Sequence, residues 1–205
     1  MGAVDRRSEL ARAGGGDVDR SSELARTEGR NSISLASYIR SIPDFPKPGI
    51  MFRDITPLLA SAEGLDATLA ALTDLAGDLE PDMVIGAEAR GFLFGPALAH
   101  QLGAGFALAR KPGSLPHHTI SHEYALEYGT NVLELHEDAI ASGARVLVHD
   151  DLLATGGTAR ALCELVERLG GEVVGCAFLI ELAFLPGREV LAPYDVRTLI
   201  SYDAE

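Results

Sequence analysis

The chain has 205 residues, of which 47% are hydrophobic, and it carries a formal net charge of −13, so it can bury one sizeable core. The acidic balance, without any lysine-rich block, argues against nucleic acid as a partner. No apolar run approaches the ~20 residues that span a bilayer, and the N-terminus lacks the apolar stretch of a signal peptide, so we expect no membrane association and a cytoplasmic protein.

Residues 1–32 differ in composition from the rest of the chain. An imperfect duplication, in which Val4–Arg12 recurs as Val18–Arg26, surrounds a spacer of three glycines. The six arginines of this segment balance its six acidic residues, and its few apolar groups cannot offset the entropy lost on ordering. We therefore predict a disordered tail at residues 1–32 and a globular domain at residues 33–205.

The globular part is expected to begin with a short helix from Ser34 through Arg40, followed by a proline-rich segment from Pro43 to Pro57. Four prolines in fifteen residues forbid a regular helix or a central strand. The segment also has apolar side chains to bury, so we expect an ordered, extended loop. A simple packing arm is the alternative. The apolar residues are Phe45, Ile50, Met51, Phe52 and Ile55.

Two helix–strand units follow this segment. Apolar residues at helical spacing between Leu65 and Leu79 predict an amphipathic helix, and Met83–Ala87 predicts a buried strand. A loop with Arg90 then leads into a helix predicted over Phe92–Leu102, which is followed by a strand at Phe106–Ala109. Loops at the carboxyl ends of such strands bind ligands in open α/β sheets.

The strand at 106–109 ends in a compact basic turn that contains Arg110 and Lys111. An isolated Arg-Lys pair is often no more than part of a solvent-exposed turn without a binding role. Because Lys111 is one of only two lysines in an acidic chain, contact with an anion is the better interpretation here.

Three histidines, His117, His118 and His122, crowd the next six residues. A zinc site is an alternative, but no fourth ligand falls at a usual spacing. We therefore expect polar residues of a mobile loop. Val132–His136 alternates as a strand that returns to the main sheet.

The run from Val146 to Thr158 carries the most specific signal. A buried strand leads into two adjacent carboxylates, Asp150 and Asp151, and a small loop then leads into a helix. Glycines and a helix N-terminus can direct backbone N–H groups at a phosphate, and the threonines add hydroxyl donors. No Gly-Lys-Ser/Thr follows, so this is not a Walker loop. The predicted phosphate loop consists of Ala154, Thr155, Gly156, Gly157 and Thr158.

An ordinary strand-to-helix turn with a solvated Asp pair is the alternative, but the whole run is more specific than that. After the helix, a buried strand is predicted at Val173–Ile180 and an edge strand at Tyr194–Ser201. Cys163 and Cys176 fall within the helix and strand patterns, so we expect buried, reduced thiols.

Two motifs carry a resemblance to a known family. All thirteen positions from Val146 to Thr158 resemble the phosphoribosyl-diphosphate signature of type I phosphoribosyltransferases. The pattern Pro-Asp-Phe-Pro-x-Pro-Gly-x-x-Phe-Arg-Asp-Ile-x-Pro resembles the base-binding segment of adenine phosphoribosyltransferases. The stretch around Glu127 resembles that family's flexible hood. The resemblance runs from Leu35 to Tyr202.

This resemblance implies an α/β fold with a central, mostly parallel sheet flanked by helices, and a small hood built from the proline-rich segment and residues 110–130. It implies the reaction adenine + phosphoribosyl diphosphate → AMP + diphosphate, a purine-salvage step. Mg²⁺, bound largely through the diphosphate with possible help from Asp150 and Asp151, is the implied cofactor. A homodimer is the implied assembly.

The resemblance also implies residue roles. Asp150 and Asp151 would hold the ribose hydroxyls, and Glu127 would assist proton transfer at the base. Arg90, together with Arg110 and Lys111 of the basic turn, would handle the diphosphate. The backbone around Met51, Phe52 and Arg53 would read the amino edge of adenine.

The chain departs from the family pattern at two positions. The basic turn of these enzymes usually has a second lysine where this chain has Ser114. His149 replaces the aliphatic residue that commonly precedes the two acids. Because side chains alternate along a strand, we expect His149 to face away from Asp150 and to be a neutral core residue with its hydrogen bonds satisfied, with tuning of the pH profile as the alternative.

Two rival functions remain open from the sequence. A transferase of the same fold could act on hypoxanthine, xanthine or a pyrimidine, although Phe52-Arg53-Asp54 argues against it. A purine-sensing repressor would need a DNA-binding module, and the short neutral tail has no helix-turn-helix pattern.

Overall fold

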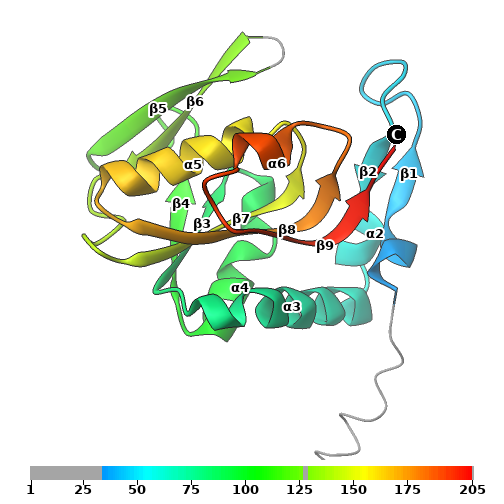
Figure 1. Cartoon of the computed structure of the whole chain (residues 1–205), viewed down its shortest axis with the longest axis horizontal. Coiled ribbons are helices and arrows are strands. Elements are labelled where there is room, and N and C mark those ends of the chain that lie inside the picture. Colours follow the sequence, from blue (N-terminus) through cyan, green and yellow to red (C-terminus); the bar gives the residue numbers. More distant parts are fainter. Residues whose placement is uncertain (1–33, 127–128, 205) are drawn as a thin grey trace, which may run out of the picture. The chain divides into compact units, whose positions relative to one another are not determined.

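The computed structural model describes residues 34–126 and 129–204. Its centre is a five-stranded sheet in the order β4-β3-β7-β8-β9, and all neighbouring strands pair in parallel (Figure 1). This confirms the predicted α/β sheet, since parallel strands need crossover connections that are here helical. The strands are β3 (Met83–Ala87), β4 (Gly105–Ala109), β7 (Arg145–Leu153), β8 (Glu172–Leu182) and β9 (Val196–Tyr202).

Alternating side chains divide the core into two layers, one on each face of the sheet. On β7, Leu147 packs on one face, while Val146 and Val148 pack on the other. The first face is covered by α3 (Ala62–Ala76) and α4 (Gly95–Leu102), and the second by α5 (Gly157–Arg168) (Figure 1). The strands are therefore covered on both faces, which explains their nearly continuous apolar sequences.

Local signals set the helix boundaries. The Ser61 hydroxyl accepts a hydrogen bond from Gly64 N at 3.0 Å and caps α3. The helix predicted to start at Phe92 starts later, at Gly95, because a 3₁₀ turn at Arg90–Phe92 comes first and Pro96 lies in the first turn of α4. Short helices also occur at α2 (Thr56–Leu59) and α6 (Gly187–Val190).

The proline-rich segment does not form a single loop. A 3₁₀ turn at Leu35–Tyr38 replaces the helix predicted through Arg40, because Arg40–Ile42 forms β1 and pairs antiparallel with β2 (Phe52–Asp54). The expected burial is only partly correct. Ile55 is buried, but Phe45 is 51% exposed, since it lies in the β1–β2 connection and reaches the Phe52 ring edge-on at 5.0 Å.

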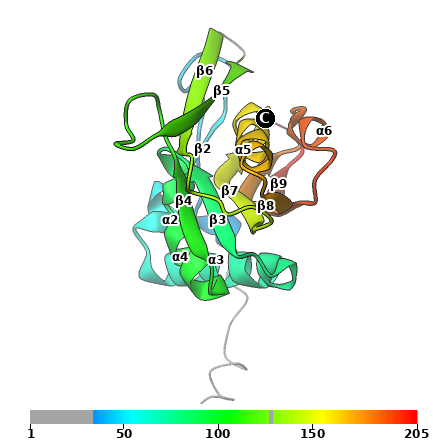
Figure 2. The same ribbon diagram turned by 90° about the vertical axis from the view of Figure 1, so that its left-hand side faces the viewer.

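The strands β5 (Thr119–Leu126) and β6 (Gly129–His136) pair as a hairpin that extends beyond the sheet (Figure 2). The prediction of a loop at His122 was therefore wrong. Residues 132–136 do form a strand, as predicted, but its main partner is β5 and not the central sheet. The short connection makes the two strands antiparallel neighbours. One bridge, Arg110 to Glu134, joins β6 to the end of β4.

The prediction for the two cysteines has a clear outcome in the core. Cys163 on α5 and Cys176 on β8 are buried free thiols with sulfur atoms 3.8 Å apart, as predicted. Within the described ranges, no helix is both long and apolar enough to cross a membrane. The predicted tail at residues 1–32 lies outside the described residues.

Candidate active site

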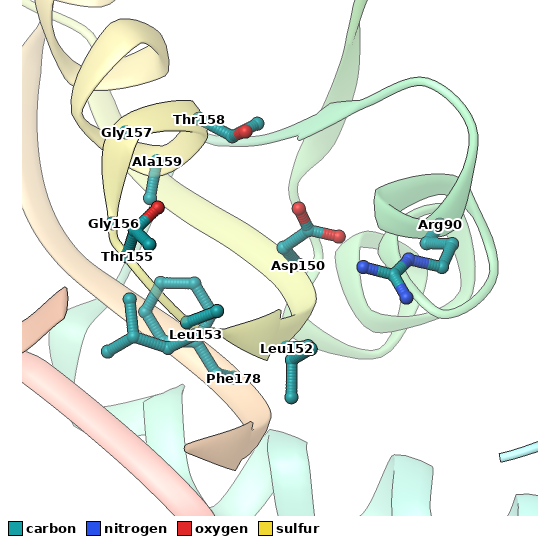
Figure 3. A pocket seen from close by; sticks show the side chains of 11 residues that line it. Arg90, Asp150, Leu152, Leu153, Thr155, Gly156, Gly157, Thr158, Ala159 and Phe178 are labelled. Atoms are coloured by element: carbon teal, nitrogen blue, oxygen red, sulfur yellow. The ribbon is translucent and has the colours of Figure 1, made fainter. Parts of the chain in front are cut away.

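The phosphate loop follows β7 and opens α5, at the carboxyl edge of the sheet. It lines a cavity of about 110 Å³ together with Arg90 and Asp150. Figure 3 shows the Asp150 carboxylate between the Arg90 guanidinium and the loop that bears Thr155 and Thr158. The structure therefore brings together, in one cavity, residues predicted for phosphate, ribose and diphosphate.

The backbone of the loop is held in place by α6. Gly156 has φ of +82°, a left-handed conformation that other residues rarely adopt, and a Cβ there would lie 2.8 Å from the Gly187 carbonyl oxygen. A Cβ on Gly187 would in turn collide with the Ala154 carbonyl oxygen. Two glycines thus allow loop and helix to touch backbone to backbone.

The two acids lie beside each other, with Asp151 buried and Asp150 partly buried. Asp151 is 3% exposed, and its backbone N–H donates to Asp150 Oδ1 at 2.9 Å. Burial, followed by the neighbouring charge of Asp151, raises the pKa of Asp150 to about 7. Burial also raises the pKa of Asp151, against the opposing effect of Arg90. Because the two carboxylates lie side by side, ionisation of one makes ionisation of the other strongly unfavourable.

Arg90 is the cation closest to this pair. Its Nε lies 3.3 Å from Asp151 Oδ1, an ion pair without hydrogen-bond geometry. Among the described residues Asp151 Oδ1 has no hydrogen-bond partner, although it is buried. The Arg90 side chain is itself half exposed. A buried carboxylate oxygen without a hydrogen bond, next to a half-exposed cation, is suited to receive a polar ligand.

A second cavity of about 150 Å³ adjoins the first and shares Arg90, Asp150 and Thr158 with it. Lys111 lines it, as predicted for a diphosphate contact, together with Glu88, Tyr124 and Asn131 and other residues.

Arg110 has a different position from Lys111. Its Nε donates to Glu88 Oε2 at 3.0 Å, and its Nη1 donates to the Ser114 carbonyl at 2.9 Å. The hydrogen bond from Arg110 lowers the pKa of Glu88, so this carboxylate stays ionised beside the arginine. Arg110 therefore braces the basic turn, while Lys111 faces the cavity.

The predicted base-binding residues lie apart from both cavities. Met51 lines a separate hollow of about 190 Å³ in the β1–β2 connection. Phe52 and Arg53 lie on β2, where the Arg53 guanidinium stacks over the Tyr202 ring at 3.8 Å and donates to Ser41 Oγ. The structure thus joins the base segment to the last strand of the sheet.

The comparisons with known proteins agree with this geometry. A family model described as phosphoribosyl transferase domain matches residues 54–200. Adenine phosphoribosyltransferase of Rubrobacter xylanophilus is 62% identical over 169 residues, which cover 82% of this chain and 91% of that protein. The chain belongs to the adenine phosphoribosyltransferase family.

Solved structures of this family have the same fold. The crystal structure of adenine phosphoribosyltransferase from Thermoanaerobacter pseudethanolicus superposes with a TM-score of 0.80 at 51% identity, and covers 82% of this chain and 98% of that one. The Saccharomyces cerevisiae enzyme, complexed with adenine and an imino-altritol bisphosphate, gives a TM-score of 0.76 at 38% identity and covers 80% of this chain and 95% of its own.

His149, one departure from the adenine phosphoribosyltransferase pattern, is fully buried and stacks edge-on against Phe94. Its Nδ1 lies 2.9 Å from the Ala177 carbonyl oxygen, and Nε2 finds no partner within the described part of the chain. Burial lowers the pKa of His149 to about 4. The prediction of a buried core histidine is confirmed, but the expected hydrogen bonding is only half met, because one of the two ring nitrogens has no partner among the residues described.

The other histidines do not form a metal centre in the described part of the chain, where no group of three His, Cys, Asp or Glu side chains could hold a metal ion. His122 instead lies on β5 and pairs with Glu164 of α5 at 3.0 Å. Glu127, the predicted catalytic residue at the base, lies outside the described residues.

Three polar residues of the second cavity were not predicted as site residues: Glu88, Tyr124 and Asn131. Tyr124 and Asn131 are directly opposed on β5 and β6. Side chains alternate between the two faces of each strand, but this pattern places Tyr124 and Asn131 on the same face only when the hairpin register is known. Glu88 could have been identified as a site residue from the sequence, because it directly follows a buried strand.

Proposed function

We propose that the two joined cavities transfer the 5-phosphoribosyl group of phosphoribosyl diphosphate to adenine, giving AMP and diphosphate in purine salvage. The observation that carries this assignment is the sharing of Arg90, Asp150 and Thr158 by the phosphate loop cavity and the cavity beside Lys111. One ligand with a phosphate at one end and a diphosphate at the other would span both.

The phosphate loop would hold the 5′-phosphate. Its backbone N–H groups lie at the N-terminus of α5, where the helix dipole favours an anion. The hydroxyls of Thr155 and Thr158 add donors. This end of the substrate does not react, so its binding energy serves to position the ribose carbon.

Asp150 and Asp151 would fix the ribose hydroxyls. In ribosyl transfer the C1′–O bond to diphosphate breaks as the bond from C1′ to the base nitrogen forms, and positive charge develops on the sugar. Ionised carboxylates beneath the ribose stabilise that charge. The pKa of Asp150, about 7 in the free protein, would fall as positive charge approaches.

Arg90 and Lys111 would bind the diphosphate, and Arg110 would brace the turn that carries Lys111. The carboxylates fit Mg²⁺, a hard cation, but in the described residues they do not form a three-ligand cluster. The ion would thus be held mainly by the diphosphate, with help from Asp150, which lines both cavities, and from Asp151 beside it. Mg²⁺ held there would neutralise the leaving group.

Adenine would be read by the backbone around Met51, Phe52 and Arg53, and Glu127 would assist proton transfer at its imidazole side. Both roles rest on the family resemblance. Carbonyl acceptors that face the amino group would reject 6-oxopurines, since these would leave buried polar groups unpaired. The same resemblance supports a homodimer, whereas the composition of the sequence supports a cytoplasmic location and a tail at residues 1–32 outside the catalytic domain.

A direct assay tests this function. The protein is incubated with Mg²⁺, phosphoribosyl diphosphate and one of adenine, hypoxanthine, guanine or uracil, and nucleotides are separated by chromatography. We expect AMP from adenine and little product from the other bases. Formation of IMP or UMP in preference to AMP, or of no nucleotide at all, would contradict the proposal.

The double substitution Asp150→Asn/Asp151→Asn tests the acid pair. It keeps the shape of both side chains but removes their negative charge, so kcat should fall at least ~100-fold, as for the loss of a preorganised electrostatic group. AMP binding, measured by calorimetry, should change much less because the phosphate loop is intact. Turnover close to that of the wild type would exclude this loop as the active site.

A further inference from the structure

A chain of three polar groups connects the β5–β6 hairpin to the phosphate loop. Asn131 Nδ2 on β6 donates to Tyr124 Oη on β5 at 3.1 Å, and Tyr124 Oη lies 3.2 Å from Thr158 Oγ1 at the start of α5. All three residues line the second cavity, and the Tyr124 ring packs against the core. Tyr124 on the hairpin therefore contacts Thr158, which is proposed to bind the 5′-phosphate.

The direction of this chain follows from the donors available. Asn131 Oδ1 accepts from Val132 N–H at 3.2 Å, which turns the amide nitrogen towards Tyr124. That nitrogen can only donate, so the phenolic hydrogen of Tyr124 remains free for Thr158 Oγ1. Once Thr158 accepts this bond, its own hydrogen is available to an anion in the phosphate loop. Hydrogen bonds that run in the same direction along a chain also strengthen one another by polarisation.

We propose that Tyr124 is a positioning residue for the 5′-phosphate. Its hydroxyl, held by Asn131, turns the Thr158 hydroxyl so that it donates into the phosphate loop. Without this contact the Thr158 hydroxyl is free to rotate away from the phosphate. The inference rests on the proposed function, since it takes the phosphate loop as the phosphate site.

The hairpin does not depend on the Tyr124 hydroxyl for its attachment to α5. Arg168 Nη1 donates to the Ser121 carbonyl at 2.6 Å, and His122 pairs with Glu164. Both contacts lie further along α5, away from the phosphate loop. Removing the Tyr124 hydroxyl should therefore leave the hairpin docked and the fold intact, so that an effect on ligand binding can be measured.

The test compares two tyrosines that each lose only a hydroxyl. Tyr124→Phe should raise KM for phosphoribosyl diphosphate and Kd for AMP about fivefold to tenfold, the effect of one hydrogen bond, and leave KM for adenine unchanged. The control is Tyr194→Phe, because the Tyr194 hydroxyl donates to Glu167 of the same helix at 2.8 Å, remote from the phosphate loop. It should bind AMP like the wild type.

A double-mutant cycle separates positioning from general stability. Thr158→Val removes the hydroxyl that Tyr124 is proposed to orient, so adding Tyr124→Phe to it should weaken AMP binding less than twofold further. Asn131→Ala should weaken AMP binding in the same direction by a smaller factor. Equal losses from Tyr124→Phe in both backgrounds, or no loss in either, would overturn the inference.

The outcomes distinguish this inference from the proposed function. If the wild type forms AMP and Tyr124→Phe binds it equally well, the positioning role is wrong while the function stands. If the wild type forms no nucleotide, the proposed function fails and the inference fails with it. Should Tyr124→Phe unfold, Asn131→Ala supplies the same comparison, and unchanged AMP binding by that variant would contradict the role.

Discussion

At the scale of single residues, Ser114 shows how this chain departs from its relatives without losing the turn. Its backbone carbonyl accepts a hydrogen bond from Arg110 Nη1, so the main chain of residue 114, and not its side chain, holds the arginine. The side chain is therefore free to vary. A lysine would add a mobile charge near the diphosphate, whereas serine can add only a neutral hydroxyl.

Ser114→Lys should lower KM for phosphoribosyl diphosphate several-fold, because a hydrated ion pair contributes about 1 kcal/mol. KM for adenine should barely change. Ser142→Lys is the matched control, since it adds the same charge to an exposed turn before β7, at the opposite edge of the sheet. If neither constant changes in Ser114→Lys, the side chain at 114 points away from the diphosphate.

At the scale of elements, the site depends on contacts between segments that are distant in the chain. The phosphate loop rests on α6 through Gly156 and Gly187. The base segment rests on the last strand, where Arg53 of β2 stacks over Tyr202 of β9. Each contact holds a short binding segment against the rigid sheet, and each can be tested by one substitution.

Gly187→Ala should displace the phosphate loop, because the added Cβ meets the Ala154 carbonyl, which is backbone and cannot swing aside. We expect Kd for AMP to rise at least about tenfold, as a small misplacement of positioning groups is costly. Gly77→Ala is the control, since its φ is −63° and a Cβ there meets nothing within 4 Å. Unchanged AMP affinity in Gly187→Ala would show that α6 does not support the loop.

Tyr202→Ala should raise KM for adenine about threefold to tenfold, the range of a partly desolvated cation–π contact, with less effect on phosphoribosyl diphosphate. The loss would free the Arg53 guanidinium and so loosen β2. Tyr202→Phe keeps the aromatic face and should behave like the wild type. If the alanine variant retains the wild-type KM for adenine, the contact does not position the base segment.

At the scale of the whole molecule, folding shifts the pKa values of two neighbouring residues on β7 in opposite directions. The pKa of His149 is lowered from 6.5 to about 4, so between these values the unfolded chain binds the extra proton, and stability falls as the pH falls. The pKa of Asp150, which shares its ionisation with Asp151, is raised from 3.8 to about 7. Its contribution is complete below pH 3.8 and is lost as the pH rises through 7.

In the wild type the two effects oppose each other between pH 4.5 and 6.5, within the range over which folding changes the protonation of both groups. His149→Val should leave the Asp150 effect alone, so the free energy of unfolding falls with rising pH by at most about 1.4 kcal/mol per unit. Asp150→Asn should give the opposite slope. Urea unfolding with EDTA at several pH values measures both, and slopes parallel to the wild type would contradict the pKa directions.

His149→Val should also leave the pH–rate profile unshifted, since a group with a pKa of about 4 is neutral over the working range. A displaced acidic limb would instead support a tuning role for His149. The two measurements on one variant thus separate its effect on folding from its effect on catalysis.

The sequence by itself determined the parts that depend on local spacing. Apolar runs bounded by glycine and proline predicted the sheet strands, because a strand buried on both faces must be apolar throughout. The acid pair and the phosphate loop were predicted for a similar reason. Asp150, Asp151 and the five loop residues fall within nine positions of the chain, so one strand end and the turn after it bring Asp150 and the loop to the same cavity.

Only the tertiary structure decided the contacts between distant residues. The hairpin register that sets Tyr124 opposite Asn131, and the packing that brings Tyr124 to Thr158, 34 positions away, have no local pattern. The same is true of Arg110 and Glu88, which are 22 positions apart. Periodicity determines which face a side chain is on, whereas its partner depends on how separate elements pack against each other.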